Sequence, residues 1–390
     1  MEYERVLHGR FADTEGVYEA YVGVSKGKIA KISDNELKGR DFISILQPHY
    51  IFPAFIDTHV HLREPGWEQK EDFATGSAAA LNGGVKTVLD MPNLPEPIDT
   101  LERLEEKIAL AQGMLVDIRH FAMATNAGEI KKMARLAVGY KIYTAKSTGD
   151  SIMSWDAIEK ASSIIASVDK PATFHCEDKS LFTGATRHSD ARPRESEILA
   201  IEKALGVVEK TGVEANIAHV STEEGARFCR EAEVMHEVTP HHAFFTKEQE
   251  SPLLKMNPPL REKRDCDALL RALREGNCML ATDHAPHTLK EKQGINPPSG
   301  VPGLDTYGLF VSWLLKEKWV SPRAIAKVTS HNAARFFSLP GGRIAEGAPA
   351  AFTVIGTEGS TIVHNSDVKT KCGWTPFDGI TMPGKVIRVG

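Results

Sequence analysis

Two histidines stand at the end of an apolar run in the segment FPAFIDTHVHLREPG, residues 52–66. Successive side chains of a β-strand alternate between its faces, so His59 and His61 would project to the same side, roughly 7 Å apart at their bases. An HxH pair alone fits a structural role as well as a metal site. Three further apolar runs also end in a potential metal ligand: His175, His219 and Asp283. Five imidazole or carboxylate groups at one rim would form a metal-ligand set.

A lysine, Lys141 in GYKIYT, ends another run of this kind. Taken alone, it is more simply explained as a side chain that reaches solvent or meets a carboxylate, because an unpaired buried ammonium is costly. Burial near cations would instead favour the neutral amine. A neutral amine can add carbon dioxide to form a carbamate, which could bridge two metal ions about 3.5–4 Å apart. The residues alone leave both interpretations open.

These groups can meet only if the runs that carry them are neighbouring strands. Eight short runs rich in Val, Ile, Ala and aromatic residues lie at 51–62, 84–93, 117–125, 137–144, 171–178, 214–222, 236–244 and 277–287. Helix-like segments lie between most of them, at 70–82, 100–112, 151–167, 194–211 and 223–234. Eight βα units predict an α/β fold, a TIM (β/α)8 barrel with its site at the carboxyl ends of the strands. An open doubly wound sheet is the alternative, but no GxGxxG follows the first run.

The two ends of the chain differ from the barrel pattern. Residues 1–50 and 343–390 contain short β stretches with Gly and Pro turns and no convincing helix. We therefore predict that residues 51–342 form the barrel. The two terminal segments would pair into one discontinuous small β-sandwich domain, packed rigidly against the barrel because no low-complexity linker separates them.

Composition excludes several classes of function. The 390 residues include 47 Lys and Arg against 52 Asp and Glu, a net charge of −5 with no long basic block, so we expect no nucleic-acid partner. No leader-like apolar segment opens the chain, and no run of about 18 apolar residues occurs, so we expect no membrane association and a cytoplasmic location. The five cysteines form no CxxC pair and are interpreted as reduced thiols.

Two motifs resemble the signatures of a known family. DTHVHLREPG (57–66) and ATDHAPHTLKEK (281–292) resemble the two signature motifs of the dihydroorotases, within the cyclic amidohydrolase superfamily. Arg63 and His287, one in each motif, make the match more specific than the histidine pair alone. Further similar stretches lie at 90–93, 140–143, 174–178, 218–222, 238–242, 257–261 and 300–306.

The resemblance implies an activity and a metal centre. The activity is the reversible hydrolysis of the cyclic amide of dihydroorotate to N-carbamoyl-aspartate, in de novo pyrimidine (UMP) biosynthesis. Two divalent ions are implied, with zinc as the default for such ligands. One ion would be held by His59, His61 and Asp283, the other by His175 and His219, with Lys141 between them as N6-carboxylysine. A hydroxide shared by the ions would attack, and Asp283 would be the catalytic proton carrier.

The resemblance also implies substrate contacts. Arg63, Asn93 and His287 would bind the substrate carboxylate, and Asn257 would meet the ring amide groups. A bidentate guanidinium suits a carboxylate, although Arg63 considered alone could simply pair with Glu64 or Asp57. A loop residue that closes over substrate would be Ser147 or Thr148. His284 would support the site through hydrogen bonds, and His241 and His242 would be structural.

Two other functions share much of this pattern. A hydantoinase or allantoinase would keep the metal ligands but would need no group that binds a substrate carboxylate. Arg63 and His287 indicate such a group and therefore argue against this alternative. A non-catalytic scaffold would be expected to lack ligands, and here every ligand is present. Some dihydroorotases bind aspartate transcarbamoylase, so this enzyme is an expected partner beside the small-molecule substrate. We also expect a homodimer.

Overall fold

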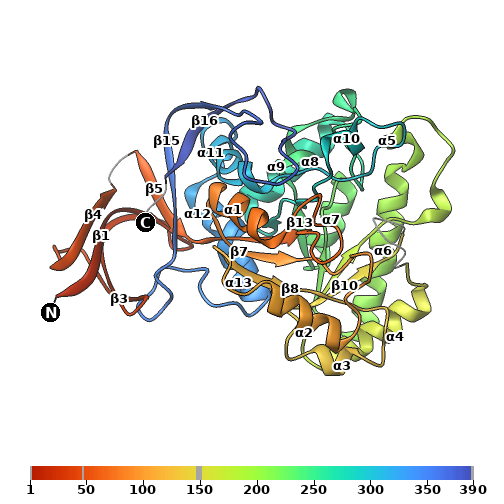
Figure 1. Ribbon diagram of the computed structural model, residues 1–390, viewed down its shortest axis with the longest axis horizontal. Coiled ribbons are helices and arrows are strands. Elements are labelled where there is room, and N and C mark those ends of the chain that lie inside the picture. Colours follow the sequence, from red (N-terminus) through yellow and green to blue (C-terminus); the bar gives the residue numbers. More distant parts are fainter. Residues whose placement is uncertain (1, 46–47, 146–151, 388–390) are drawn as a thin grey trace.

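A ring of short parallel strands forms the centre of the computed structural model, which describes residues 2–45, 48–145 and 152–387 (Figure 1). The strands pair in two parallel sheets. The chain runs from one sheet into the other at Phe121, and a backbone hydrogen bond from His61 N to His284 O closes the opposite seam. The predicted fold class is confirmed. The ring contains β6 Phe55–Val60, β7 Val85–Asp90, β8 Asp117–His120, β9 Ala122–Met123, β10 Tyr140–Tyr143, β11 Ala172–His175, β12 Ala215–Ile217, β13 Met235–Val238 and β14 Met279–Leu280.

Burial explains why these strands read as continuous apolar runs. Every residue of β6, β10, β11 and β12 is buried. Parallel strands are covered on both faces, by helices outside and by packed side chains inside, so they show no polar alternation. A polar side chain buried in such a strand is therefore costly unless it has a hydrogen-bond partner or a ligand. The polar side chains at the strand ends are for this reason candidates for a binding site.

Helices surround the ring and start at the expected signals. The predicted helix at 194–211 coincides with α6, and Asp72, Thr100 and Thr222 cap three others with their side chains. The helices are α1 Phe73–Asn82, α2 Leu101–Leu110, α3 Ile130–Met133, α4 Trp155–Ala166, α5 His188–Ala191, α6 Arg194–Thr211, α7 Glu223–Glu231, α8 Pro240–Phe244, α9 Lys263–Glu275, α10 Leu289–Lys292, α11 Tyr307–Glu317, α12 Pro322–Ala326 and α13 Asn332–Phe336.

Several predicted runs extend beyond the observed strands. The run at 51–62 begins inside β5 (His49–Pro53), which belongs to the sheet built from the two ends of the chain, and the run at 277–287 contains only the short strand β14. The run at 236–244 was predicted as a strand throughout, but β13 ends at Val238 and α8 begins at Pro240. Thr239 accepts a hydrogen bond from His242 N as the N-cap, and proline at the first helical position has its φ preset for a helix. The Thr-Pro pair therefore turns the chain at the barrel rim.

A mixed seven-stranded sheet gathers segments from both ends of the chain, at the left of Figure 1. β5 pairs with β15, and β1 pairs with β2, β4 and β5, so Phe11 and Val354 share one apolar core. The exact division of the chain into 1–50 plus 343–390 and 51–342 stays a prediction. The sheet contains β1 Tyr3–Ala12, β2 Val17–Ser25, β3 Lys28–Ser33, β4 Gly39–Ile45, β5 His49–Pro53, β15 Phe352–Ile362 and β16 Thr381–Ile387.

The segment between β15 and β16, residues 363–380, lies against the barrel and is called here the C-terminal strap. Trp374 and Phe377 are buried in a cluster with Phe245 and Val301 of the barrel loops. Trp374 Nε1 donates a hydrogen bond to His287 O at 2.8 Å. The carboxyl-terminal segment therefore supports the barrel mouth as well as the small sheet.

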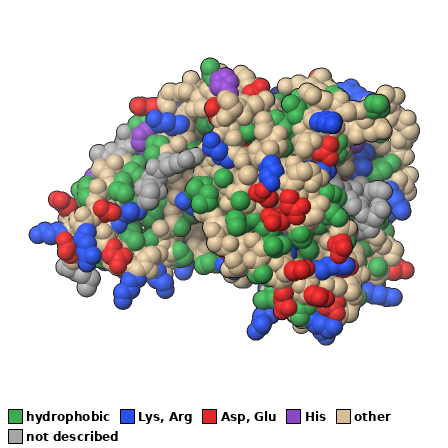
Figure 2. Space-filling model, in the orientation of Figure 1, with side chains coloured by type: hydrophobic (Ala, Val, Ile, Leu, Met, Phe, Trp, Pro, Cys, Tyr) green, Lys and Arg blue, Asp and Glu red, His purple; other side chains and the backbone are tan. Residues whose placement is uncertain are grey.

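The molecular surface carries both signs of charge. Figure 2 shows Lys and Arg side chains mixed with Asp and Glu over the visible face. Among the described residues, no helix is both long and apolar enough to cross a bilayer. All five cysteines are free thiols, as predicted, and Cys176 is buried in the barrel core.

Candidate active site

Three of the predicted metal ligands meet at the carboxyl ends of β6 and β14. His61 Nε2 lies 3.0 Å from Asp283 Oδ1, and His59 Nε2 lies 3.4 Å from the same oxygen. One ligand atom of each side chain lies within 4.8 Å of the other two, and all three residues are buried. This spacing can hold a metal ion.

The remaining predicted ligands come from β10, β11 and the turn after β12. His175 Nδ1 lies 3.0 Å from His219 Nε2, and the His219 ring centroid lies 5.1 Å from that of His59. Lys141 Nζ lies 3.4 Å from His59 Nε2. The structure therefore brings together all six side chains that the sequence suggested as ligands.

Lys141 is fully buried, so its ammonium does not reach solvent. It forms no ion pair with a carboxylate in the part of the chain that the structure describes, and its Nζ lies 5.3 Å from the centroid of the Tyr143 ring. Burial lowers the pKa of Lys141 to about 8. Neither of the simpler explanations for this lysine, solvent contact or a carboxylate partner, applies to this geometry.

Outer hydrogen bonds fix the orientation of three of the imidazoles. His59 Nδ1 donates to Glu237 Oε2 at 2.7 Å, His61 Nδ1 to Asn93 Oδ1 at 2.8 Å, and His175 Nε2 to Glu177 Oε2 at 2.9 Å. The other nitrogen of each ring therefore carries a lone pair and faces the cluster. Metal-ligating histidines are held in this way, by a second acceptor that sets tautomer and ring orientation.

Burial also keeps the ligand side chains in the ionisation states that bind metal. It lowers the pKa of His61 to about 4 and that of His219 well below its usual value, so both imidazoles are neutral at pH 7. Asp283, buried beside His59 and His61, adds a carboxylate to these imidazoles. The cluster thus offers imidazole lone pairs and one carboxylate.

Three site residues have left-handed backbone conformations. The φ angles are +66° at Arg63, +37° at His219 and +46° at Asp283. Such conformations cost about 1–3 kcal/mol at a non-glycine residue and persist only where the surrounding structure holds them. All three follow the carboxyl end of a barrel strand, where the chain must turn sharply to aim a side chain over the mouth.

A cationic wall stands beside the metal cluster. Arg63 is buried, its Nε donates to Pro286 O at 3.2 Å, and its guanidinium lies 3.3 Å from His287 Nε2. His287 Nδ1 accepts from Lys70 Nζ at 3.1 Å, and Lys70 pairs with Glu291 at 3.0 Å. Arg63 itself forms no ion pair with a carboxylate among the described residues. A buried guanidinium beside the cavity is thus available to a carboxylate ligand.

Both carboxylates considered as partners of Arg63 are engaged elsewhere. Asp57 Oδ1 accepts from Thr282 N at 3.0 Å, and Glu64 Oε2 accepts from Phe73 N at 2.8 Å. The simpler interpretation of Arg63 as a local ion-pair partner does not fit these contacts.

A cavity lies between the metal cluster and this wall. The predicted substrate contacts Arg63, Asn93 and Asn257 line it, whereas His287 stands behind Arg63 and the loop at 299–300. The remaining lining residues are His59, His61, Tyr143, His175, His219, Asp283, Ala285, Ser299 and Gly300. Ser147 and Thr148, predicted to close over substrate, lie outside the described residues.

The model of the amidohydrolase family matches residues 50–389, which include the whole barrel and both histidine motifs. The chain belongs to the amidohydrolase family. A dihydroorotase of Thermococcus kodakarensis is 34% identical over 392 residues, covering 99% of this chain and 92% of that protein. A dihydroorotase of Halobacterium salinarum is 35% identical over 361 residues, covering 88% and 85%. The resemblance to the dihydroorotases is therefore confirmed.

Solved structures place this amidohydrolase in the same fold. An L-hydantoinase from Arthrobacter aurescens superposes with a TM-score of 0.93 over 99% of this chain and 94% of that one, at 23% identity. At that identity the likeness concerns the fold. Family membership and the His59, His61 and Asp283 cluster together make this chain a metal-dependent hydrolase.

Two carboxylates of this amidohydrolase site were not recognised in the sequence. Glu237, from β13, also accepts from Asn216 Nδ2 at 2.8 Å and from Thr58 Oγ1 at 3.1 Å, so it joins three strands under the cluster. Glu177 follows His175 by two residues, and that spacing was the available signal. Glu237 lies 178 residues from His59, and only the closed barrel brings them together.

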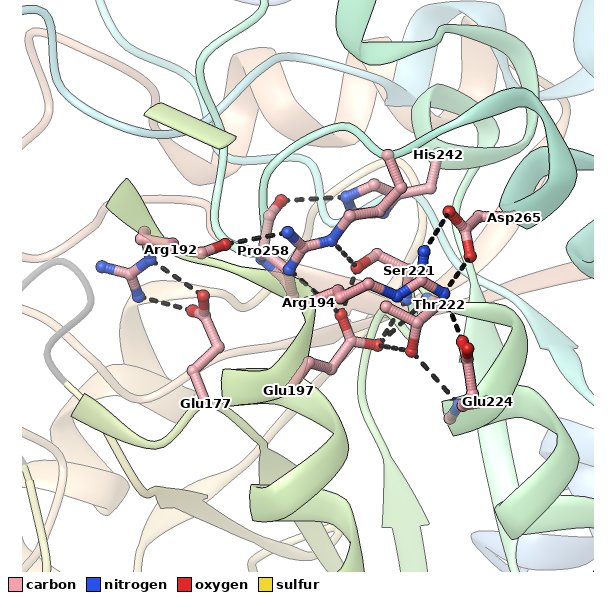
Figure 3. Close-up of polar contacts among 12 residues, drawn as sticks. Glu177, Arg192, Arg194, Glu197, Ser221, Thr222, Glu224, His242, Pro258 and Asp265 are labelled. Carbon is pink, nitrogen blue, oxygen red and sulfur yellow. Dashed lines mark hydrogen bonds and ion pairs between the residues drawn. The ribbon is translucent and has the colours of Figure 1, made fainter. Parts of the chain in front are cut away.

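Two buried glutamates anchor the loops that carry His175 and His219, one through an ion pair and the other through a hydrogen bond to the backbone. Glu177 accepts from Arg192 Nε at 2.9 Å, and Glu197 accepts from Ser221 N at 2.8 Å (Figure 3). Figure 3 shows both carboxylates turned toward these partners. Since Ser221 follows His219 by two residues, the hydrogen bond to Glu197 fixes the turn after β12.

Tyr143 was also not recognised as a site residue. It follows Lys141 by two residues on β10, so both side chains point the same way. Its hydroxyl is buried and has no hydrogen-bond partner among the described residues, and the residue lines the cavity. A buried hydroxyl without a partner is costly unless a ligand supplies one.

His284 and His242, for which supporting roles are predicted, both form hydrogen bonds to barrel loops. His284 Nε2 donates to Glu71 Oε2 at 3.2 Å, and its Nδ1 accepts from Gly303 N at 3.1 Å. His242 Nε2 donates to Pro258 O at 2.9 Å (Figure 3). Both side chains therefore hold loops of the barrel mouth.

Proposed function

We propose that this chain is a dihydroorotase, which reversibly hydrolyses the cyclic amide of dihydroorotate to N-carbamoyl-aspartate in de novo pyrimidine (UMP) biosynthesis. The observation that carries the proposal is Arg63, a buried cation without a carboxylate partner among the described residues, in the wall of a cavity that also contains the His59, His61 and Asp283 cluster. Such a cavity suits a cyclic amide that bears a carboxylate. The dihydroorotase relatives, at 32–35% identity over most of the chain, support the same conclusion.

Arg63 would bind the substrate carboxylate through its bidentate fork. Asn93 would assist it with its amide group, whose Oδ1 accepts a hydrogen bond from His61 Nδ1. His287 would hold the guanidinium in place from behind and complete the polar wall. Asn257 would meet the ring amide, with its Oδ1 oriented by His188 Nε2 at 2.9 Å.

The cluster would hold two divalent ions, with zinc as the default. His59, His61 and Asp283 would bind one ion and His175 and His219 the other. When bound, the ions would lower the pKa of a water molecule and polarise the amide carbonyl.

Lys141 would stand between the two ions as N6-carboxylysine. Full burial, proximity to His59 and the absence of a carboxylate partner among the described residues support this proposal. The carbamate would add the negative charge that four imidazoles and one carboxylate lack for two divalent ions.

The chain's own residues would carry the protons. Asp283 would accept the proton of the attacking water and deliver it to the leaving ring nitrogen, and the same group would act in reverse when the ring closes. Tyr143, whose hydroxyl has no partner among the described residues, would donate a hydrogen bond to the bound substrate.

An activity assay with N-carbamoyl-aspartate, hydantoin and allantoin tests the proposal. Ring closure of N-carbamoyl-aspartate with little turnover of the other two is expected, because neither hydantoin nor allantoin offers a carboxylate to Arg63. Preferred turnover of hydantoin or allantoin would refute the proposal in favour of a related cyclic amidohydrolase. No turnover of any of the three, with metal bound, would indicate a scaffold.

A homodimer and a complex with aspartate transcarbamoylase are further proposals, which rest on the family resemblance. Light scattering of the purified chain, alone and mixed with aspartate transcarbamoylase from the same source, tests both. We also propose a cytoplasmic location, and a division of the chain into a barrel at 51–342 and a small domain from both termini.

A further inference from the structure

Lys292 ends α10 and is the last residue of the second signature motif, yet neither the metal centre nor the substrate contacts account for it. Its side chain is fully buried although its neighbour Lys290 on the same short helix is exposed. A buried lysine usually has a carboxylate partner. Lys292 forms no ion pair in the described parts of the chain, so its position requires another explanation.

Three backbone carbonyls surround the Lys292 ammonium. Its Nζ donates to Lys255 O at 2.9 Å, to Pro298 O at 3.0 Å and to Gly300 O at 2.9 Å. The Trp374 ring of the C-terminal strap lies 5.9 Å away, within the range of a cation–π contact. An ammonium has three N–H donors, so all of them are used.

The three carbonyls belong to the two loops that line the cavity beside the cationic wall. Lys255 lies two residues before Asn257, whereas Pro298 and Gly300 flank Ser299. Asn257, Ser299 and Gly300 all line the cavity. The single cation therefore fixes the spacing between the two loops.

Gly300 shows how closely the second loop approaches the wall. Its φ is +137°, and a Cβ at this position would lie 2.5 Å from Ala285 O and 3.1 Å from His287 Cδ2. Ser299 O accepts a hydrogen bond from His287 Nε2 at 3.1 Å. Since His287 stands behind Arg63, the contacts form a continuous path from Lys292 through Ser299 and His287 to the guanidinium.

We propose that Lys292 is a positioning residue for substrate binding: its ammonium ties the Asn257 loop to the Ser299–Gly300 loop and thereby sets the cavity wall that faces the substrate carboxylate. It touches neither substrate nor metal ligands. The inference rests on the proposed dihydroorotase activity, because its readout is the binding of that substrate.

Three variants test the inference in the full-length, metal-loaded enzyme. Lys292→Met keeps the aliphatic stem and removes all three donors. Lys292→Gln is shorter and neutral but keeps an amide N–H₂ group. Lys290→Met, on the exposed side of the same helix, makes the same chemical change outside the loop contacts. For each, kcat and KM for dihydroorotate, metal per chain and the thermal midpoint are measured.

Lys292→Met is expected to raise KM about tenfold or more, the equivalent of about 1.4 kcal/mol, while kcat falls less and metal content stays at the wild-type level. Lys292→Gln is expected to give an intermediate KM, and Lys290→Met the wild-type value. An unchanged KM with a lowered thermal midpoint or a lowered yield would overturn the inference, because it would make Lys292 only structural. If Lys292→Met does not fold, the KM of Lys292→Gln decides on the same terms.

The two proposals fail in different ways. A wild-type enzyme that does not turn over dihydroorotate refutes the proposed function, and the inference falls with it. A wild-type enzyme that does so, combined with a wild-type KM in the Lys292 variants, refutes the inference alone.

Discussion

The metal cluster and the cationic wall face each other across one cavity, but they are built differently. The cluster consists of side chains at or next to the ends of barrel strands, such as His59, His175 and Asp283. The wall consists of loops, in which Arg63 depends on His287 and His287 depends on Lys70 and Ser299. The position of the cluster follows from the barrel itself, whereas the position of the wall follows from contacts between loops.

This difference predicts that mutations in the two regions change different properties of the enzyme. A change in the cluster should alter metal content, because its groups are ligands or hold ligands. A change in the wall should alter substrate binding and leave metal content as it is. A residue that violates this division would show that the cluster and the wall depend on each other.

The largest effect is expected from Lys141→Ala. If Lys141 is the carbamate bridge, the variant should lose at least one ion, and a loss of about 4 kcal/mol of transition-state stabilisation would lower kcat about 10³-fold. Elemental analysis and kinetics on the same preparation measure both quantities. Short carboxylic acids should restore some turnover by entering the vacated space.

Lys141→Met distinguishes the bridge from an ordinary buried lysine. A packed lysine would tolerate methionine, which replaces most of its stem at modest cost. Two tightly bound ions and near-normal hydrolysis in Lys141→Met would therefore exclude the carbamate bridge.

The next effect is expected on the wall, in Arg63→Met. Loss of a charge-assisted hydrogen bond costs about 1.5–3 kcal/mol, so kcat/KM for dihydroorotate should fall about 10–150-fold, with metal content near that of the wild type. Kinetics with metal analysis check this. Wild-type rates would refute the carboxylate clamp, and loss of metal would show that Arg63 supports the cluster as well.

Strand periodicity explains why the cluster could be predicted from the sequence. His59 and His61 are two residues apart in one predicted strand, and His175, His219 and Asp283 each end an apolar run, so the barrel pattern alone predicts that they meet. The roles of Arg63 and His287 came from the resemblance to the dihydroorotases. The fold was predictable for the same reason as the cluster, but the limits of individual strands were not: at Thr239, for example, a helix cap was read as strand.

The outer contacts could not be predicted, because they join residues far apart in the chain. Glu237 and His59 are 178 residues apart, and Lys292 meets a carbonyl 37 residues away. Asn93 was predicted to bind substrate, and the structure shows that its side chain also holds His61. No local spacing indicates such partners, since they depend on which strands and loops become neighbours after the barrel closes.

Glu237→Gln tests the division at a residue that is no proposed ligand but holds the ligand His59. Glutamine keeps the size of the side chain but replaces the charged carboxylate that accepts the hydrogen bond from His59 Nδ1 with a neutral amide. Loss of such an outer partner typically costs 10–100-fold in metal affinity or activity, and a similar loss in affinity is expected here. Competition with a chelator measures the affinity. Wild-type metal affinity together with a raised KM would place Glu237 with the wall and break the division.

The smallest effect is expected from Tyr143→Phe, at the boundary between the two regions. The Tyr143 hydroxyl is buried and has no partner among the described residues, so its removal breaks no hydrogen bond to any of them. The thermal midpoint of the variant should therefore equal or exceed that of the wild type.

The same hydroxyl lines the cavity, so the bound substrate would lose one neutral hydrogen bond in Tyr143→Phe. Such a bond contributes about 0.5–1.5 kcal/mol, which predicts a two- to twelvefold fall in kcat/KM at wild-type metal content. Melting curves and steady-state kinetics of the metal-loaded variant check both expectations. Loss of metal would instead assign Tyr143 to the cluster beside Lys141. Unchanged kinetics with a lowered thermal midpoint would make it a packing residue, because only a structural contact could then account for the loss.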